Sequence, residues 1–285
     1  GAGDAPLSEP ETRAMTDFIV GHKNISIAVY GHTFSGALLR PSASVADTEL
    51  PTGDLRLYKM MGKKGEEITG YPALSTFHDY RYDPKSVIQG TENWFYETLG
   101  IVSWTVEYWA PHRQAGVEVT EYIEWFNEHP VEDDLKMLRW SDEVLDGQGY
   151  VDWYEFDHPV LGQIELGGWN MLQSISNPPD HLIEKEIAPV IEWVLWLGAL
   201  TPCLELYRTA VKALGEDTYR IEFVIENTGY MPTYGMERAV EGKVTREVVA
   251  EIHLPEGCSL VQGKARENLG HLNGRNNVPA ASFYN

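Results

Sequence analysis

The sequence predicts an α/β fold followed by a small domain of β-strands. Residues 8–22 have the spacing of an amphipathic helix, and a short turn leads from them into a strand of small and β-branched residues that ends at His32. Residues 101–109 have the composition of a second buried strand. A helix that leads directly into a buried strand is half of a doubly wound unit, so helices are expected to flank a central sheet.

The first helix carries clear signals at its start. Ser8 and Glu11 fit a capping box, and Pro10 lies in the first turn, where its missing N–H group does no harm. The strand that follows ends at His32, between Gly31 and Gly36. Ligands of α/β proteins bind at the carboxyl ends of strands, so His32 is a candidate metal ligand or acid–base group. A histidine satisfied within the core is the alternative.

Residues 40–90 contain a charged, partly helical stretch and then a loop with two tyrosines, Tyr80 and Tyr82. Functional residues favour loops, so this loop is a candidate substrate lid. Tyrosines that simply pack the loop onto the body are an equal alternative. A short helix is expected next, and Gly100 ends it.

Glu107 interrupts a strand that is otherwise largely apolar or aromatic. A carboxylate there is costly unless it is paired, metal-bound or directed into a cleft. Burial among Trp104, Tyr108 and Trp109 is expected to raise its pKa toward the range of a general base. An ordinary ion pair is the alternative, but the nearest basic residue in sequence is Arg113, outside the strand. We therefore favour a catalytic role for Glu107.

Later segments carry structural signals. Residues 119–145 are mainly helical and acidic, residues 156–168 form a turn-rich strand pair, and residues 180–200 form a long apolar helix. The buried face of this helix is expected to contain Ile187, Val190, Ile191, Val194, Leu195 and Leu197.

A domain boundary is expected at Thr201 and Pro202. Beyond it, apolar and polar residues alternate between turn signals, as in antiparallel strands. We therefore predict one domain over residues 1–200 and a small β-sandwich-like domain over residues 201–285. The second domain carries no catalytic grouping, so its expected role is to pack on the first or to steer substrates.

Length and charge narrow the function. The chain has 285 residues, enough for one large domain and one small one. Its 22 Lys and Arg residues against 43 Asp and Glu residues give a net charge of −21, which argues against nucleic acid or an anionic membrane as a partner. No stretch approaches the ~20 apolar residues of a membrane span. No signal peptide pattern is present, so the compartment stays open.

The two cysteines, Cys203 and Cys258, lack the spacing of a zinc site or a disulfide framework, although a single bridge between them stays open.

Four short motifs occur in a fixed order. They are Ser-Glu-Pro-Glu-Thr from Ser8, His-Thr-Phe-Ser-Gly from His32, Trp-Phe-Tyr from Trp94, and Ser-Trp-Thr-Val-Glu from Ser103 to Glu107. Together they resemble the zinc carboxypeptidase family of the carboxypeptidase A type, over roughly residues 4–200.

The resemblance implies a mixed, mostly parallel central sheet flanked by helices. It implies a zinc-dependent metallocarboxypeptidase, in which His32 is a zinc ligand and Glu107 is the general base and then the acid. Peptides are then the expected substrate. The family's mobile tyrosine corresponds first to Tyr82 and second to Tyr80. The substrate cleft is expected to be lined by the aromatic residues Phe34, Trp94, Trp104 and Tyr108. Glu92 is expected to form the floor of the side-chain pocket, which favours a C-terminal Lys or Arg; a one-residue slip in the alignment would place Thr91 or Asn93 there instead.

The sequence also departs from the family. The family takes its other two zinc ligands from an H-x-x-E motif that precedes the Ser-Glu-Pro-Glu-Thr helix, together with an arginine clamp for the substrate carboxylate. We therefore expect the chain to be the second half of a catalytic domain, and its first residue, Gly1, to be a cut end. His129/Glu132 and His181/Glu184 have the H-x-x-E spacing, but we interpret both as solvated faces.

Two other functions stay open. One is an inactive homologue that binds peptides or glycans, and the other is a different metallohydrolase that uses one of the two H-x-x-E pairs with His32. A half sheet would expose a long edge, so a homo-oligomer formed through that edge is also possible.

Overall fold

The structure, a computed structural model, describes residues 3–81 and 90–277. Its strands are β1 (Ile27–Thr33), β2 (Ala37–Arg40), β3 (Ala73–Ser75), β4 (Val102–Tyr108), β5 (Tyr150–His158), β6 (Gly162–Trp169), β7 (Leu204–Gly215), β8 (Thr218–Asn227), β9 (Val249–Glu251) and β10 (Arg266–Asn268). Its longer helices are α1 (Pro10–Gly21), α2 (Thr52–Thr69), α7 (Val131–Val144) and α8 (Asp180–Gly198). The short helices and helical turns are η1 (Asp47–Glu49), α3 (Thr76–Asp79), α4 (Thr91–Asn93), η2 (Trp94–Thr98), α5 (Pro111–Gln114), α6 (Tyr122–Asn127), η3 (Met171–Ile175), α9 (Glu237–Glu241) and η4 (Arg275–Asn277).

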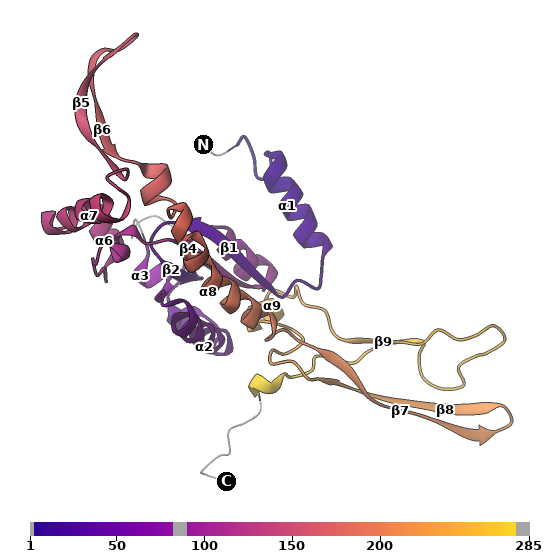
Figure 1. Ribbon diagram of the computed structural model, residues 1–285. Helices are drawn as coiled ribbons and strands as arrows, with labels where there is room; N and C mark the ends of the chain where they lie inside the picture. Colours follow the sequence, from indigo (N-terminus) through magenta and orange to yellow (C-terminus); the bar gives the residue numbers. More distant parts are fainter. Residues whose placement is uncertain (1–2, 82–89, 278–285) are drawn as a thin grey trace, which may run out of the picture.

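A four-stranded sheet lies at the centre, in the order β1-β4-β2-β3 (Figure 1). β1 and β4 are parallel, β2 and β3 are parallel, and β2 and β4 are antiparallel. The predicted α/β fold with a mixed, mostly parallel sheet is therefore confirmed. β1 stands at one edge, and β4 is its partner among the described residues.

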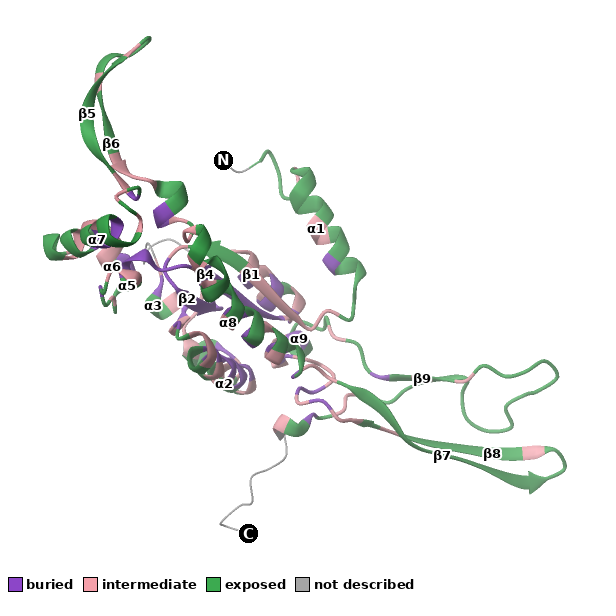
Figure 2. Ribbon diagram, viewed as in Figure 1, coloured by how far each residue is buried: buried purple, intermediate pink, exposed green. Residues whose placement is uncertain are grey.

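Helices α2 and α8 pack together against one face of this sheet (Figure 1). Tyr58 and Met61 of α2 and Trp193 of α8 are fully buried there, and Trp104 of β4 packs edge-on against both Tyr58 and Trp193. Aromatic pairs in this arrangement add to the stability gained by burial. The main core therefore lies between the sheet and these two helices, where buried residues concentrate in Figure 2.

The buried face of α8 differs from the expected one. Val190, Trp193 and Leu197 are completely buried, whereas Ile191 and Leu195 are 47% and 70% exposed. Apolar residues surround much of this helix, so its helical period alone did not identify the face that Trp193 anchors in the core. The other apolar stripe of α8 faces away from the sheet.

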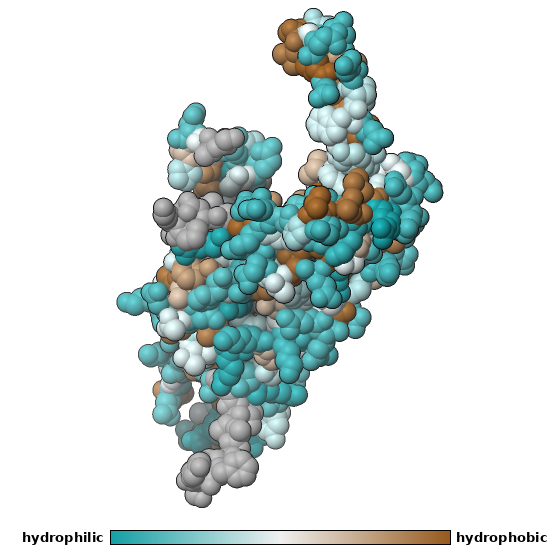
Figure 3. All heavy atoms as spheres, turned by 90° about the vertical axis from the view of Figure 1, so that its left-hand side faces the viewer, coloured by the Kyte–Doolittle hydropathy of each residue, from teal (hydrophilic) through white to brown (hydrophobic). Residues whose placement is uncertain are grey.

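Two long hairpins project from the body (Figure 1). In the β5–β6 hairpin, the turn carries Val160 and Leu161, exposed by 84% and 70%, and apolar surface covers its tip in Figure 3. The β7–β8 hairpin is exposed along the whole of β7. The antiparallel strands expected after residue 201 are confirmed. They form two separate two-stranded sheets, β7–β8 and β9–β10, and this arrangement is simpler than the expected sandwich.

A β-bulge gives the β7–β8 hairpin one apolar face. Leu206 pairs with Ile225 before the bulge, and Val211 pairs with Ile221 after it. The bulge lies between Leu206 and Arg208 and adds one residue to β7. In a strand with regular alternation, Leu206 and Val211, which are five residues apart, would lie on opposite faces.

The segment after the β7–β8 hairpin returns to the body. Met231 and Met236 are fully buried and belong to the main core. The Asp54 carboxylate of α2 accepts hydrogen bonds from the backbone N–H groups of Glu237 and Arg238 at the start of α9, at 2.7 and 3.0 Å. Residues on both sides of the expected boundary at 201 therefore share one core. In the part of the chain that the structure describes, no helix combines the length and apolarity that crossing a membrane requires.

Candidate active site

His32 and Glu107 lie side by side at the exits of two parallel strands. They are register partners in the β1–β4 ladder, and partners on adjacent strands direct their side chains to the same face of the sheet. The His32 Nδ1 atom lies 3.7 Å from the Glu107 Oε1 atom. The His32 side chain is 57% exposed and the Glu107 side chain is 8% exposed. The structure thus combines an accessible imidazole with a buried carboxylate.

Burial raises the pKa of the Glu107 carboxyl above its usual range, His32 partly offsets this increase, and Glu92 adds to it. The Glu107 Oε2 atom is buried without a hydrogen-bond partner among the described residues. An orphaned carboxylate oxygen is costly in a folded protein, and such groups concentrate at functional sites. Glu107 therefore has the properties of a proton acceptor held ready for a group that binds beside it.

The surroundings of Glu107 differ in part from the expected ones. Side chains alternate along β4, so Ser103, Thr105 and Glu107 share one face, while Trp104 and Tyr108 point to the other. Trp104 packs in the main core, on the side of α2 and α8. The expectation that Trp104 and Tyr108 surround the carboxylate was therefore wrong, although its burial and the direction of its pKa shift are as expected.

Glu92 lies near Glu107 and is held in place by its neighbours. Its Oε1 atom accepts a hydrogen bond from the Asn93 side-chain amide at 2.7 Å. The Asn93 carbonyl oxygen in turn accepts one from the Ala43 backbone at 2.7 Å, and Ser103 donates to the Glu92 main-chain oxygen at 2.6 Å. A side chain at Gly90 would collide with the Glu92 carboxylate. Glu92 is only 9% exposed, so the site contains a second fixed carboxylate.

The aromatic residues expected around the substrate do not form one cluster among the described residues. Phe34 follows His32 closely and packs edge-on against Phe126 of α6, with ring centres 5.6 Å apart. Tyr80 is buried, and its hydroxyl donates to the Ser35 hydroxyl at 3.1 Å. Tyr82, the first choice for the mobile tyrosine, lies outside the described residues. The roles of Phe34, Tyr80 and Tyr82 remain predictions.

Tyr30 belongs to the same site and was missed by the sequence argument. It lies two residues before His32 on β1, so both side chains occupy the same face. Burial raises the pKa of the Tyr30 hydroxyl, a hydrogen bond with Thr91 lowers it, and the Glu92 carboxylate raises it further. The signal was available, because the strand period that places His32 on this face also places Tyr30 there.

Neither H-x-x-E pair approaches this site as a ligand pair. The His129 Nδ1 atom lies 2.8 Å from the Trp125 carbonyl oxygen, and its Nε2 atom lies 3.1 Å from Asp134 Oδ1. Burial is the largest single influence and lowers the pKa of His129, but the hydrogen bonds with Asp134 and Trp125 and the charges of Asp134 and Asp133 together outweigh it, so the pKa is raised. His181 and Glu184 are exposed at the start of α8.

The described residues do not form a complete zinc site by themselves. A catalytic zinc ion takes three protein ligands and keeps one position open. Over residues 3–81 and 90–277, no three His, Cys, Asp or Glu side chains gather closely enough to hold a metal ion. His32 fits one ligand position because its imidazole is accessible, and the orphaned Glu107 oxygen fits a base beside the metal.

A model of a known protein family matches the first part of the chain. The family model described as zinc carboxypeptidase covers residues 1–129, which include His32, Glu92 and Glu107. Residues 1–129 match the zinc carboxypeptidase family. The match is shorter than the region, residues 4–200, over which the motifs suggested it.

The C-terminal part of the chain matches a different family. A second family model, described as a domain of unknown function (DUF8731), covers residues 203–283. A search of the curated proteins gave no match. The zinc carboxypeptidase resemblance of residues 1–129 is thus joined to a segment whose family has no assigned function.

Proposed function

We propose that this chain supplies catalytic residues of a zinc metallocarboxypeptidase, which removes C-terminal residues from peptides. The observation that carries the proposal is the pairing of the accessible His32 imidazole with the buried Glu107 carboxylate at the exits of adjacent strands. The family match over residues 1–129 supports it. Zinc in such a site lowers the pKa of a bound water molecule and polarises the peptide carbonyl.

Within this function, Glu107 acts on protons. Its raised pKa places the carboxyl closer to neutrality, where it accepts a proton from water and later returns it to the leaving amine. His32 would hold one position on the metal, and because its Nδ1 atom lies 3.7 Å from Glu107 Oε1, the base would lie next to that position. The remaining ligands and the clamp for the substrate carboxylate are then expected from polypeptide beyond the described residues.

Substrate selection follows from Glu92. This carboxylate is buried on the same side as Glu107 and is fixed by Asn93. A buried anion at the floor of a pocket favours a cationic side chain, because binding the cation compensates for the cost of burying the charge. The proposed substrates are peptides that end in Lys or Arg, and Phe34 supplies an apolar wall.

The test measures peptide hydrolysis by an N-terminally extended, zinc-loaded form of the protein. Release of the C-terminal residue is expected, and Glu107→Gln is expected to lower kcat at least about 100-fold while zinc content is retained. Glu184→Gln, an exposed acid on α8, is the matched control. A Glu107→Gln variant that keeps full activity would contradict the assignment.

A second candidate function is peptide binding without cleavage. The incomplete ligand set among the described residues favours it. A labelled peptide ending in Lys distinguishes the two functions. The enzyme cleaves the peptide when zinc is supplied, whereas a binding module holds the peptide and releases it intact.

The outer edge of β1 is the proposed site of further strand pairing. Among the described residues β1 pairs only with β4, so its other edge presents free backbone groups. Either further polypeptide of the same chain or a second copy could add a strand there. Light scattering on the 285-residue chain and on an extended form separates these arrangements, because a second copy doubles the mass of the shorter protein.

A further inference from the structure

Two adjoining hollows lie where the carboxypeptidase-like region meets the segment after residue 203. Their volumes are about 150 and 330 Å³. They share the lining residues Lys23, Ile25, Leu99, Ile101, Val244 and Arg246. Lys23 and Ile25 come from the turn before β1, Leu99 and Ile101 from the turn before β4, and Val244 and Arg246 from the segment between α9 and β9.

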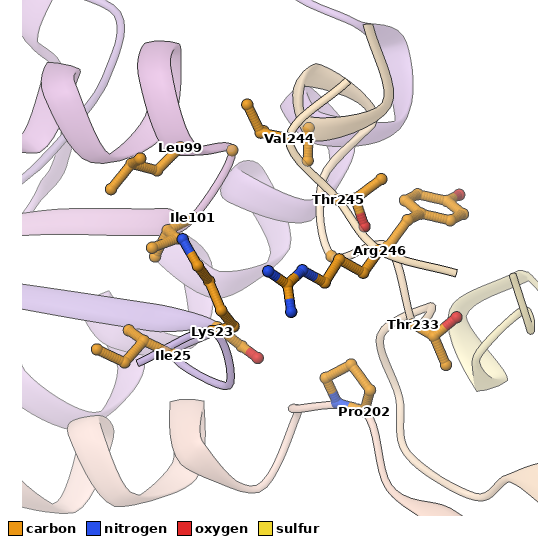
Figure 4. Close-up of a pocket in the computed structure, with 14 residues that line it drawn as sticks. Lys23, Ile25, Leu99, Ile101, Pro202, Thr233, Val244, Thr245 and Arg246 are labelled. Carbon is orange, nitrogen blue, oxygen red and sulfur yellow. The ribbon is translucent and has the colours of Figure 1, made fainter. Parts of the chain in front are cut away.

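Two cations point into this space. Both side chains line the hollow: the Arg246 guanidinium extends toward the Lys23 side chain, whose ammonium group lies beside Ile101 (Figure 4). Within the described part of the chain, neither side chain has an ion-pair or hydrogen-bond partner. Both residues are exposed, so both charges are hydrated and accessible to an anion, in a chain that carries 43 acidic residues against 22 basic ones.

Apolar side chains form part of the wall around the two cations, and Ser26, Thr233, Tyr234 and Thr245 add polar groups to the smaller hollow. Ile25, Leu99, Ile101 and Val244 surround the space between them (Figure 4). Two like charges that line one hollow repel each other, and solvent screens this repulsion only in part. An anion placed between the two cations replaces this repulsion with two charge-assisted contacts.

The backbone beside the hollow is tightly packed. Gly100 has a φ of 64° and lies against α9, where a side chain at this position would collide with Ala239. The Val244 backbone N–H donates to the Ala239 carbonyl at 3.0 Å. Asp54 anchors the start of α9 through two backbone hydrogen bonds. A preformed site loses little entropy when a ligand binds.

We propose that this hollow binds a small organic anion with an apolar tail. The anionic head group lies between Lys23 and Arg246, and the tail packs against Ile25, Ile101 and Val244. The site is separate from the candidate active site. β1 begins at Ile27, beside the hollow, and His32 lies near its other end, about 17 Å along the strand at 3.3 Å per residue.

The test titrates the 285-residue chain with hexanoate, hexanol and acetate by isothermal calorimetry. Saturable binding is expected for hexanoate. Acetate and hexanol are each expected to bind at least about tenfold more weakly, because acetate lacks the apolar tail and hexanol lacks the negative charge. Lys23→Gln and Arg246→Gln are each expected to raise the Kd for hexanoate about tenfold or more, and the double variant to abolish binding. Circular dichroism and Tm confirm that each variant is folded.

Arg220→Gln is the matched control, because Arg220 is an exposed cation on the β7–β8 hairpin, outside both hollows. It is expected to leave hexanoate binding unchanged. Any of three results would overturn the proposal: no hexanoate binding, hexanol or acetate as tight as hexanoate, or equal weakening by Arg220→Gln and Arg246→Gln.

Discussion

His32 and Glu107 occupy matching register positions on adjacent parallel strands, with 3.7 Å between His32 Nδ1 and Glu107 Oε1. The two residues are far apart in sequence, and only the β1–β4 pairing brings them together. One is exposed and the other is buried, so the pair offers an accessible ligand atom next to a carboxylate with a raised pKa. This relationship links the fold to the proposed chemistry.

The charge on Glu107 is expected to cost stability. Because the pKa of Glu107 is raised by burial, the folded protein binds this proton more tightly than the unfolded chain, and stability is lost as pH rises through the folded-state pKa. Glu107→Gln removes the charge, so the free energy of unfolding at pH 7 is expected to rise by about 0.5–2 kcal/mol. Urea denaturation at pH 7 and pH 4 measures it.

The gain from Glu107→Gln should shrink at pH 4, where the wild-type carboxyl takes up its proton. Glu184→Gln, at an exposed position, serves as the control and should change little at either pH. If Glu107→Gln lowers stability at pH 7, the carboxylate is better satisfied than the orphaned Oε2 atom indicates.

The second prediction concerns substrate choice. Glu92→Gln removes the buried anion proposed to bind a cationic side chain. In the zinc-loaded, extended protein, the ratio of kcat/KM for C-terminal Lys over C-terminal Phe should fall at least about tenfold, mainly through slower release of Lys. Competition between two peptides that differ only in the last residue gives the ratio directly. Equal preferences in wild type and variant would show that Glu92 is not the pocket floor.

His112 is expected to make the fold sensitive to acid. It is 3% exposed beside Tyr122 and Trp125, and burial lowers the pKa of its imidazole to about 4, with Arg113 adding to the decrease. The unfolded chain therefore binds the proton more readily. The contribution of the neutral His112 to the free energy of unfolding is complete above the unfolded-state pKa of 6.5. It is lost as pH falls toward 4, and the loss amounts to about 3 kcal/mol.

His112→Phe, a ring that cannot be protonated, should remove this part of the pH dependence. Unfolding free energies between pH 7 and 4 for wild type and variant measure the difference. His181→Phe, at an exposed position, is the control and should keep the wild-type slope. Identical slopes for wild type and His112→Phe would contradict the burial of the neutral imidazole.

Asp54 is expected to hold the C-terminal segment on the body. It is 2% exposed and accepts hydrogen bonds from two backbone N–H groups of α9 and from the Tyr96 hydroxyl at 2.9 Å. Asp54→Ala leaves these donors unpaired and should lower the free energy of unfolding by about 2–3 kcal/mol. Urea denaturation measures the loss, with Asp17→Ala on the exposed face of α1 as the control.

If Asp54→Ala destabilises the protein no more than Asp17→Ala does, then α9 is held by apolar packing alone. The comparison therefore separates the contribution of the Asp54 hydrogen bonds from that of apolar packing.

The sequence was most informative where a local rule determines the outcome. Glycines next to His32 and a carboxylate in an apolar strand identified both residues, and alternation along β1 would also have identified Tyr30. The sequence was less informative where contacts between distant segments determine which side chains are buried. Trp193 selects the buried face of α8 through contacts with α2 and β4, and no periodicity within the helix reveals that choice.

The same limit applies to the C-terminal segment. Met231 and Met236 follow a strong β pattern, yet they complete the core of the preceding region. Asp54 connects to α9 across more than 180 residues. Such long-range contacts depend on the whole fold, and a change from helical to strand pattern near residue 201 does not indicate them.

Zinc content tests the central claim most directly. The N-terminally extended protein, purified, dialysed against dilute zinc and analysed by inductively coupled plasma mass spectrometry, is expected to hold about one zinc ion per chain, as is its Glu107→Gln variant. His32→Ala should bind zinc at least about tenfold more weakly and lose most of it on dialysis, whereas the exposed His181→Ala control should retain it. Full zinc retention by His32→Ala would contradict the assignment of His32 as a ligand.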